Sequence, residues 1–309
     1  MLNNQLAIVF PGQGSQRIGM GLDFYTEYPE ARSIYDQANE ALGYDIQDIC
    51  FHENDKINLT KFTQPAILTT EIAMLKVIET EYGIKANYFA GHSLGEYSAL
   101  VAAGVIDLGS ALRIVSKRGE LMQYAVPEGI GSMAALVKDD IGQTEFLSIV
   151  KQAEVEVANY NSKDQVVISG KTEFIETACK LLSELYPDMN IVRLTVSAPF
   201  HSSLIRSIEE DFRKYIIQFP FNFENASKVL SNYTGEFHTQ DSLIDNLVSQ
   251  ISGSVDWITN MHRLLELGVE ILEVGPNRVL GKFFLSLGKE VNSIINQRSM
   301  LKNFKVEQI

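Results

Sequence analysis

Every residue of the segment Leu6–Phe10 is apolar. A strand with one face in water alternates polar and apolar residues, so a strand without this alternation is buried on both faces. Burial on both faces is typical of parallel strands that are covered by helices. A turn-rich loop, Pro11–Gln16, follows this segment and leads into alternating helical and apolar segments. We therefore expect an α/β protein.

The alternation continues along most of the chain. A second short strand, 88–90, ends at Gly91, and a later apolar strand spans 269–274. Apolar residues at helical spacing indicate the helices. We place these helices at 29–41, 64–82, 95–103, 107–124 and 203–219.

The stretch 131–196 has a different order of elements. Its pattern predicts strands at 133–137, 155–159, 166–169 and 191–196, with helices at 140–152 and 172–185. The resulting order β-α-β-β-α-β is that of a ferredoxin-like unit. We therefore predict a small domain, residues 130–197, that is inserted into a larger domain formed by residues 1–129 and 198–309.

The charge and the cysteines exclude several classes of protein. The net charge of −13 opposes binding to nucleic acid or to anionic membranes. No apolar run reaches the ~18 residues of a membrane span, and the first residues lack the features of a signal peptide. Cys50 and Cys179 form neither a disulfide framework nor a metal-like spacing. These observations lead us to expect a reduced, cytoplasmic protein without a bound metal.

The C-terminal segment departs from the acidic character of the chain. From residue 278 onward six basic residues stand against Glu290 and Glu307, which gives this tail a net charge of +4. The basic residues are Arg278, Lys282, Lys289, Arg298, Lys302 and Lys305. Two interpretations are open: a solvated surface with a chance asymmetry, or a patch for an acidic partner.

A candidate nucleophile lies in the segment Gly91–Gly95, which fits the pattern G-x-S-x-G. This pattern places a serine on a tight turn between a strand and a helix, and a predicted strand and helix flank Ser93 here. The helix N-terminus would stabilise negative charge that develops near the hydroxyl. The alternative is that Ser93 merely caps the helix.

A nucleophilic serine needs a base, and the chain has five histidines. His92 lies inside the turn, so its side chain should point away from that of Ser93. His201 lies at the junction of the predicted inserted domain and the next helix, a place where catalytic groups are often found. His201 is therefore the first candidate, and His52, His238 and His262 remain open.

Arg118 lies on the apolar face of the predicted helix 107–124, in line with Ala111, Val115 and Met122. The opposite face carries Arg113, Lys117, Glu120 and Tyr124. An arginine that points into the interior needs an anionic partner. This partner is either an internal carboxylate, in a structural ion pair, or the carboxylate of a substrate.

Motifs with a shared order extend over nearly the whole chain. They stand at 10–16 (FPGQGSQ), 62–66 (FTQPA), 91–96 (GHSLGE), 117–119 (KRG), 161–162 (NS), 165–170 (QVVISG), 199–202 (PFHS), Gln250 and 273–276 (EVGP). Together these residues resemble the malonyl-coenzyme A:acyl carrier protein transacylase family. The resemblance implies an α/β-hydrolase-like large domain with an inserted ferredoxin-like small domain.

The resemblance also implies roles for individual residues. It makes Ser93 the nucleophile and His201 the base, with a backbone carbonyl near Gln250 orienting the histidine. It assigns the oxyanion hole to the backbone N–H groups of Gln13 and Leu94.

The same resemblance makes Arg118 the clamp for the malonyl carboxylate and places His92, Asn161, Phe200 and Gln250 around the substrate. Phe200 resembles the malonyl-selective form of its position in modular polyketide synthases, whereas many fatty-acid members carry serine there. The segments 62–66 and 117–122 also resemble free-standing acyltransferases of polyketide assembly lines.

The activity implied is transfer of a malonyl group from malonyl-coenzyme A to an acyl carrier protein, through an ester on Ser93. The pathway would be polyketide or fatty-acid synthesis. No metal or redox cofactor is needed, and family members are often monomers. Three alternatives remain: a hydrolase of the same family that clears stalled acyl groups, a general serine esterase, and a non-catalytic docking protein. Arg118 speaks against the first two.

Overall fold

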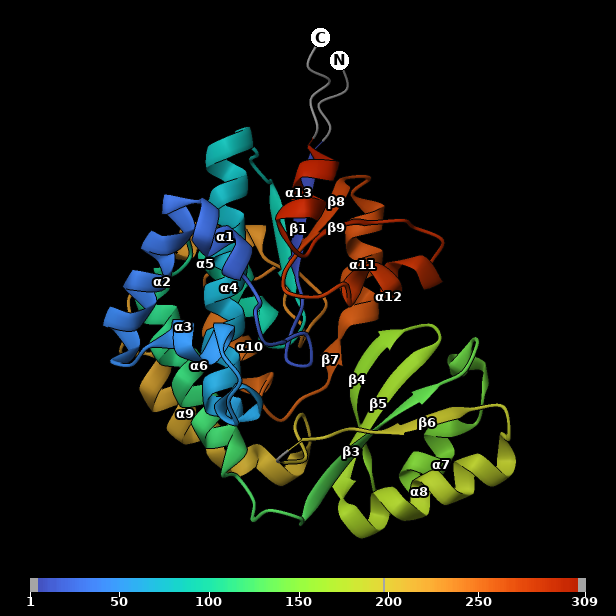
Figure 1. Ribbon diagram of the computed structural model, residues 1–309. Helices are drawn as coiled ribbons and strands as arrows, with labels where there is room; N and C mark the ends of the chain where they lie inside the picture. Colours follow the sequence, from blue (N-terminus) through green and yellow to red (C-terminus); the bar gives the residue numbers. More distant parts are fainter. Residues whose placement is uncertain (1–4, 197, 305–309) are drawn as a thin grey trace.

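A computed structural model describes residues 5–196 and 198–304 and contains two β-sheets (Figure 1). The first sheet has the strand order β2-β1-β8-β9, and all of its strands are parallel. These strands are β1 (Leu6–Phe10), β2 (Tyr88–Gly91), β8 (Glu270–Val274) and β9 (Asn292–Ile294). The predicted α/β class is confirmed, as is the prediction that Leu6–Phe10 is a buried parallel strand.

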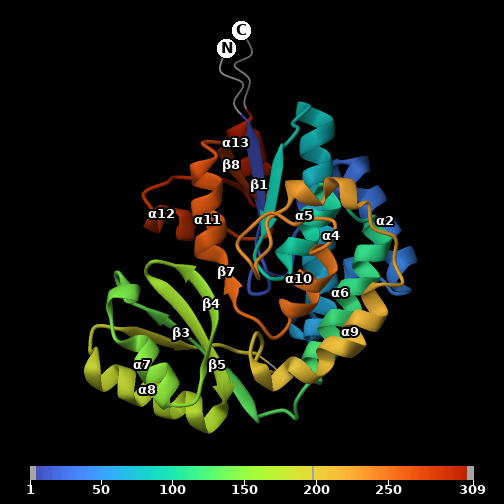
Figure 2. The ribbon, with the colours of Figure 1, turned by 180° about the vertical axis from the view of Figure 1, so that it is seen from behind.

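Helices cover both faces of this sheet, as Figures 1 and 2 show. Ile8 and Phe10 pack into a core with α2 (Pro29–Leu42), α4 (Thr60–Tyr82) and α6 (Leu108–Gln123) on one side. Ala7 and Val9 pack on the other side against α11 (Trp257–Glu266) and α12 (Leu280–Ser286). Alternate residues of β1 thus enter two apolar layers, which is why the strand carries no polar residue.

The second sheet has the order β6-β3-β5-β4-β7. β3 (Gly131–Val137), β4 (Glu156–Ser162), β5 (Gln165–Lys171) and β6 (Asn190–Arg193) pair antiparallel, while β7 (Val255–Asp256) runs parallel to β4. Helices α7 (Phe146–Gln152) and α8 (Thr172–Leu185) lie against the sheet and share its core. The predicted order of elements in this stretch is found, and β7 joins it from a distant part of the chain.

The remaining elements connect and cover the first sheet. The α-helices are α1 (Leu22–Glu27), α3 (Ile46–Phe51), α5 (Gly95–Ala102), α9 (Glu209–Ile216), α10 (Leu243–Ser249) and α13 (Gln297–Asn303). The short 3-10 helices are η1 (Lys56–Asn58), η2 (Ile141–Gln143), η3 (Ser203–Ile208) and η4 (Phe223–Lys228). Within the described ranges, no helix has the length and apolar character that a membrane crossing requires.

Several predicted boundaries were wrong for local reasons. The helix predicted at 140–152 divides into η2 and α7 because Asp140 has a left-handed φ of 49° and Thr144 is extended. The helix predicted at 203–219 divides into η3 and α9, and the N–H and hydroxyl of Ser203 at the start of η3 both donate to Glu156 of β4. The strand predicted at 191–196 ends at Arg193, after which the Val196 N–H turns back to the Leu194 carbonyl.

The helix predicted at 64–82 begins earlier, at Thr60. The N–H groups of Phe62 and Thr63 already donate to the Leu59 carbonyl, so the first turn precedes Pro65. Pro65 lacks an N–H and therefore removes one hydrogen bond of the ladder without ending the helix. The expected domain boundary at residue 197, the basic Lys305, the acidic Glu307 and the first four residues lie outside the described residues.

Candidate active site

Ser93 lies on the turn between β2 and α5 and has a left-handed backbone, with φ of 52°. Such a conformation costs a non-glycine residue about 1–3 kcal/mol and is common at functional sites. Leu94, not Ser93, is the N-cap of α5, and no side-chain cap is found for this helix in the described chain. The interpretation of Ser93 as a capping residue is therefore wrong.

The turn is packed tightly against the loop that follows β1. A Cβ atom on Gly95 would lie 2.2 Å from the Phe10 carbonyl oxygen, and one on Gly12 would lie 2.3 Å from the His92 carbonyl oxygen. Only glycine allows two backbones to approach so closely. The two glycines therefore bring Gln13 and the Ser93 turn side by side.

His201 is the histidine that contacts Ser93. Its Nε2 lies 2.8 Å from Ser93 Oγ, and its Nδ1 lies 2.7 Å from the carbonyl oxygen of Gln250. A carbonyl only accepts hydrogen bonds, so Nδ1 carries the proton and Nε2 is free to accept from the serine hydroxyl. His201 also has a left-handed backbone, with φ of 54°. This tautomer is the one that a general base needs.

The surroundings of His201 favour its neutral form. The side chain is buried, and burial followed by the nearby positive charge of Arg118 lowers the pKa of His201 to about 3. The Gln250 carbonyl acts in the opposite direction but more weakly. At neutral pH the imidazole is therefore uncharged and able to take a proton.

The other histidines are placed elsewhere. His52 is exposed and bonds to Asp48, and His262 is exposed on α11. His238 is buried and bonds through Nε2 to Glu96 over 2.7 Å. His92 makes no hydrogen bond to the Ser93 side chain among the described residues, and its Nε2 lies 2.7 Å from the Oδ1 of Asn161.

Arg118 is completely buried on the inner face of α6, as the periodicity predicted. Its Nη2 donates to Ser93 Oγ over 3.1 Å and to the Oε1 of Gln250 over 2.8 Å. Nε and Nη1 have no hydrogen-bond partner among the described residues, and none of the ion pairs formed there includes Arg118. The predicted internal ion pair is therefore not found in the described chain.

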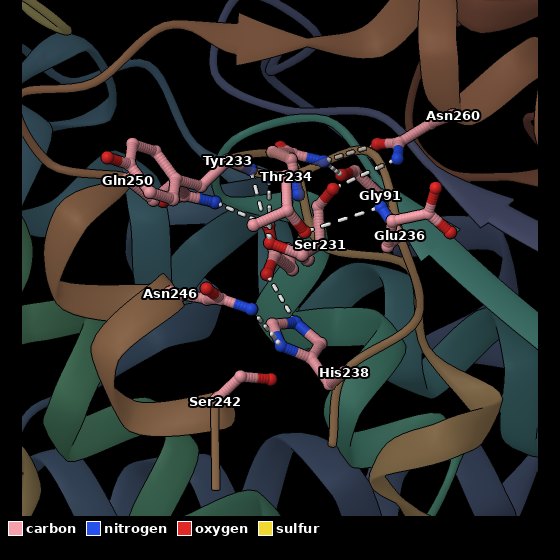
Figure 3. A network of polar contacts seen from close by, with 12 residues as sticks. Gly91, Ser231, Tyr233, Thr234, Glu236, His238, Ser242, Asn246, Gln250 and Asn260 are labelled. Carbon is pink, nitrogen blue, oxygen red and sulfur yellow. Dashed lines mark hydrogen bonds and ion pairs between the residues drawn. The ribbon is translucent and has the colours of Figure 1, made fainter.

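Burial lowers the pKa of Arg118 from its usual value, while Tyr97, whose ring lies beside the guanidinium, and Glu96 raise it. Arg118 and Glu96 are connected through Gln250, whose Nε2 donates to Glu96 Oε2 over 2.7 Å and to the Ser93 carbonyl over 3.1 Å. The two ends of the Gln250 amide thus face a cation and a carboxylate. Figure 3 shows Gln250 and His238 in this network.

The loops that follow β1 and β2, together with strands of the second sheet, line a small cavity of about 100 Å³ at Ser93. Its lining includes Gln13, His92, Phe200 and His201, together with Met133 of β3 and Asn159 of β4. Asn161 lies two residues further along β4, where its Nδ2 donates to Gln165 over 2.9 Å. The cavity therefore lies between the two sheets.

The backbone N–H groups of Gln13 and Leu94 were expected to face a developing oxyanion. In the part of the chain that the structure describes, neither N–H group makes a hydrogen bond to protein. The N–H of Ser93, by contrast, donates to the side chain of Asn232 over 2.5 Å. Gln13 and Leu94 thus keep the donors that such a site requires.

The sequence assigned no role to Glu96 or Asn232, and it left His238 only as an open candidate for the base. All three are buried polar residues below the Ser93 turn, and they bond to one another or to the turn itself. Glu96 lies inside the motif at 91–96, which could have indicated a buried carboxylate at the start of α5. Asn232 lies in a turn-rich segment with no motif of its own. No cluster of three potential metal ligands occurs among the described residues.

The chain is similar to known acyltransferases. The Acyl transferase domain family matches residues 7–256. A malonyl CoA-acyl carrier protein transacylase from Bacillus subtilis is 39% identical over 284 residues, which cover 90% of this chain and 70% of the relative. The chain belongs to this transacylase family. It is accordingly an enzyme of the acyltransferase class, as predicted.

Further transacylases match over almost their full length. The protein of this name from Staphylococcus aureus is 36% identical, with 93% of this chain and 94% of the relative covered. The crystal structure of the transacylase from Clostridium perfringens has a TM-score of 0.89 at 35% identity and covers 97% of this chain and 96% of its own.

One similar structure also contains a partner. It is a type II polyketide acyl carrier protein in complex with its malonyl-transacylase. The match has a TM-score of 0.89 at 32% identity and covers 96% of this chain and 98% of the other.

Proposed function

We propose that this enzyme transfers a malonyl group from malonyl-coenzyme A to the phosphopantetheine thiol of an acyl carrier protein, through an ester on Ser93. The observation that carries the proposal is the position of Arg118. A buried guanidinium that lacks a carboxylate partner among the described residues lies 3.1 Å from the proposed nucleophile. The carboxylate of a malonyl group would supply the missing charge and accept two hydrogen bonds.

In the first half-reaction, His201 Nε2 takes the proton of Ser93 Oγ as the oxygen attacks the thioester carbonyl. The carbonyl oxygen becomes an anion that the N–H groups of Gln13 and Leu94 stabilise. The C–S bond then breaks, and the coenzyme A thiolate takes the proton from His201. The Gln250 carbonyl holds the imidazole in place and stabilises its transient charge.

The second half-reaction reverses these roles with a different thiol. The phosphopantetheine thiol of the carrier protein gives its proton to His201 and attacks the ester carbonyl, and Ser93 leaves with that proton. Both half-reactions pass through the same kind of oxyanion, so one pair of N–H groups serves both. Neither step requires a metal or a redox cofactor.

Around the acyl group, His92, Asn161 and Phe200 would shape the cavity. Phe200 is buried and lines the cavity directly, so it would limit the space beside the malonyl carbon. His92 and Asn161 hold each other across the gap between the turn and β4. We assign the pathway to polyketide or fatty-acid synthesis.

We propose that each of the two sheets belongs to a separate domain with its own role. An α/β-hydrolase-like catalytic domain, residues 1–129 and 198–309, would carry Ser93, Arg118 and His201. A ferredoxin-like small domain, residues 130–197, would close the cavity from the other side through β3 and β4.

One assay tests this function against hydrolytic editing and simple ester cleavage. The enzyme is incubated with malonyl-coenzyme A, with and without acyl carrier protein, and three products are followed by mass: acyl-enzyme, acyl-carrier protein and free malonate. We expect acyl-enzyme in both reactions and malonyl-carrier protein only when the carrier is present. Free malonate as the main product in both reactions would contradict the proposal.

A further inference from the structure

The side chain of Asn232 makes hydrogen bonds at the end of β2 like those of a neighbouring parallel strand. Phe89 of β2 forms a parallel bridge with Val229. Beyond the end of the strand, the Nδ2 of Asn232 donates to the Gly91 carbonyl over 2.7 Å, and its Oδ1 accepts from the N–H of Ser93 over 2.5 Å. A residue of a parallel strand bonds in the same way to the two residues that flank its neighbour. The side-chain amide therefore replaces a backbone group where the Ser93 turn leaves the sheet.

The position of this amide is fixed from every side. Asn232 is fully buried, and its Nδ2 also donates to Asn260 over 2.9 Å (Figure 3 labels Gly91 and Asn260). Its own N–H donates to Glu96 over 2.9 Å, and its carbonyl accepts from Asp256 over 2.8 Å. A backbone N–H only donates and a carbonyl only accepts, so the amide has one permitted orientation.

We propose that Asn232 is a positioning residue for acylation, which holds Ser93 in its left-handed conformation and so aligns its hydroxyl with His201. The inference rests on the proposed function of Ser93. With φ of 52°, Ser93 needs support from its surroundings, and the bond to Asn232 fixes its peptide group. The same bond occupies the Ser93 N–H and leaves oxyanion binding to Leu94 and Gln13.

The first test is Asn232→Ala, measured by the rate of malonyl-enzyme formation at increasing malonyl-coenzyme A. Because a small misplacement of reacting groups can cost about a hundredfold in rate, we expect kcat to fall by roughly that factor. KM should change little, since Arg118 keeps its place. A purely structural role would instead lower the fraction of active enzyme and leave the rate of the remainder unchanged.

Asn246→Ala is the matched control. Asn246 is also a buried asparagine below the turn, but its side chain lies 3.3 Å from the Nδ1 of His238 and makes no bond to residues 91–93. We expect this variant to lose stability and to keep its kcat. Equal kcat losses in the two variants would overturn the proposal.

Asn232→Asp provides a second test that keeps the size of the side chain. A protonated Asp can donate to the Gly91 carbonyl as the amide does, whereas a carboxylate cannot. The titratable residues around it are Glu96, which accepts from the backbone N–H of residue 232, Asp256, whose backbone N–H donates to the carbonyl of residue 232, and His238 beyond Glu96. We expect the kcat of this variant, relative to the unmodified enzyme, to fall as the pH rises.

The outcomes separate this inference from the proposed function. If the unmodified enzyme formed no malonyl-enzyme, the proposed function itself would be wrong. A normal malonyl-enzyme rate in Asn232→Ala, or an Asp variant that matches the unmodified enzyme at every pH, would overturn the role of Asn232 and leave the function intact.

Discussion

The Nη2 atom of Arg118 lies 3.1 Å from the Oγ atom of Ser93. Ser93 lies on the turn between β2 and α5, whereas Arg118 lies on α6. A third group, the Oε1 of Gln250, lies 2.8 Å from the same Nη2. Arg118 thus touches the proposed nucleophile directly, while its Nε and Nη1 have no partner among the described residues. One residue, Arg118, can therefore bind a substrate carboxylate and hold the Ser93 hydroxyl in position.

Replacement of Arg118 by alanine should therefore change selectivity. A charge-assisted hydrogen bond contributes about 1.5–3 kcal/mol, so we expect malonyl kcat/KM to fall roughly ten- to a hundredfold or more. Acetyl-coenzyme A has no carboxylate, so its binding leaves the buried charge of Arg118 without an anionic partner, which weakens binding. The alanine variant has no such charge and therefore lacks this cost. Its relative activity on acetyl-coenzyme A should rise, as measured by steady-state transfer of both substrates.

Arg113→Ala is the control for this experiment. Arg113 lies on the exposed face of the same helix and contacts the ring of Phe219. This variant should keep both the rate and the preference for malonyl. An Arg118→Ala enzyme that stays folded and retains its malonyl preference would show that Arg118 has a structural role only.

The pH dependence follows from the lowered pKa of His201, about 3. The base is active when neutral, so its contribution is present above that pKa and is lost only as the pH falls through it. An unperturbed histidine has a pKa of ~6.5. We expect kcat/KM not to fall around this pH, because His201 is still neutral there. In Arg118→Ala one of the lowering causes is removed, so the acidic limb should move to higher pH.

The pH profiles of kcat/KM for the two enzymes check this expectation, since they report the ionisation of the free enzyme. Brief assays after transfer from neutral buffer separate titration from acid unfolding. An acidic limb at the same pH in both enzymes would contradict the influence of Arg118 on His201.

The close contact at Gly95 predicts a loss of stability in Gly95→Ala. The added Cβ would meet the Phe10 carbonyl at 2.2 Å, so β1 and the Ser93 turn must separate. Overpacking of this kind costs about 1–3 kcal/mol, and urea unfolding should show a decrease of at least this size. Gly142→Ala, where a Cβ would meet nothing within 4 Å, should leave the free energy of unfolding nearly unchanged.

The sequence predicts elements that depend on neighbouring residues, and it fails where an element depends on residues that are distant in the chain. Leu6–Phe10 and 172–185 were placed correctly because their patterns are local: an unbroken apolar run and a clear helical period. The helix predicted at 140–152 failed because its start is decided by the left-handed Asp140, which an apolar period does not reveal. Two-residue β7 has no pattern and exists only because β4 lies beside it.

The same distinction holds for the site. Ser93 and Arg118 could be found from a motif and a helical face, and His201 from its place at a junction. Asn232 could not, because it is 139 positions from Ser93 and its role depends on where a distant turn meets the end of β2. The Gln250 carbonyl was expected only through the family resemblance, since backbone groups carry no signal in a sequence.

The basic tail offers a prediction about the partner. Arg278 and Lys282 are exposed beside the same surface hollow on α12, which Leu285 and Glu290 also line. Carrier proteins are acidic, so charge reversal at these two residues should raise the KM for the carrier, and added salt should do the same. Acylation by malonyl-coenzyme A should change less.

Lys214→Glu on α9 is the matched control for the tail, since Lys214 is exposed and pairs only with acidic residues of its own helix among the described residues. Stopped assays at several carrier concentrations give the KM values. Equal effects of Lys214→Glu and of reversal at Arg278 and Lys282 would count against a docking patch.

The most direct test of the central claim is to locate the acyl group. The enzyme is incubated with malonyl-coenzyme A, digested, and mapped by peptide mass. We predict one added malonyl group on the peptide that contains Ser93, and none on the enzyme carrying Ser93→Ala. A malonyl group on another residue, or equal labelling of the Ser93→Ala enzyme, would contradict this account.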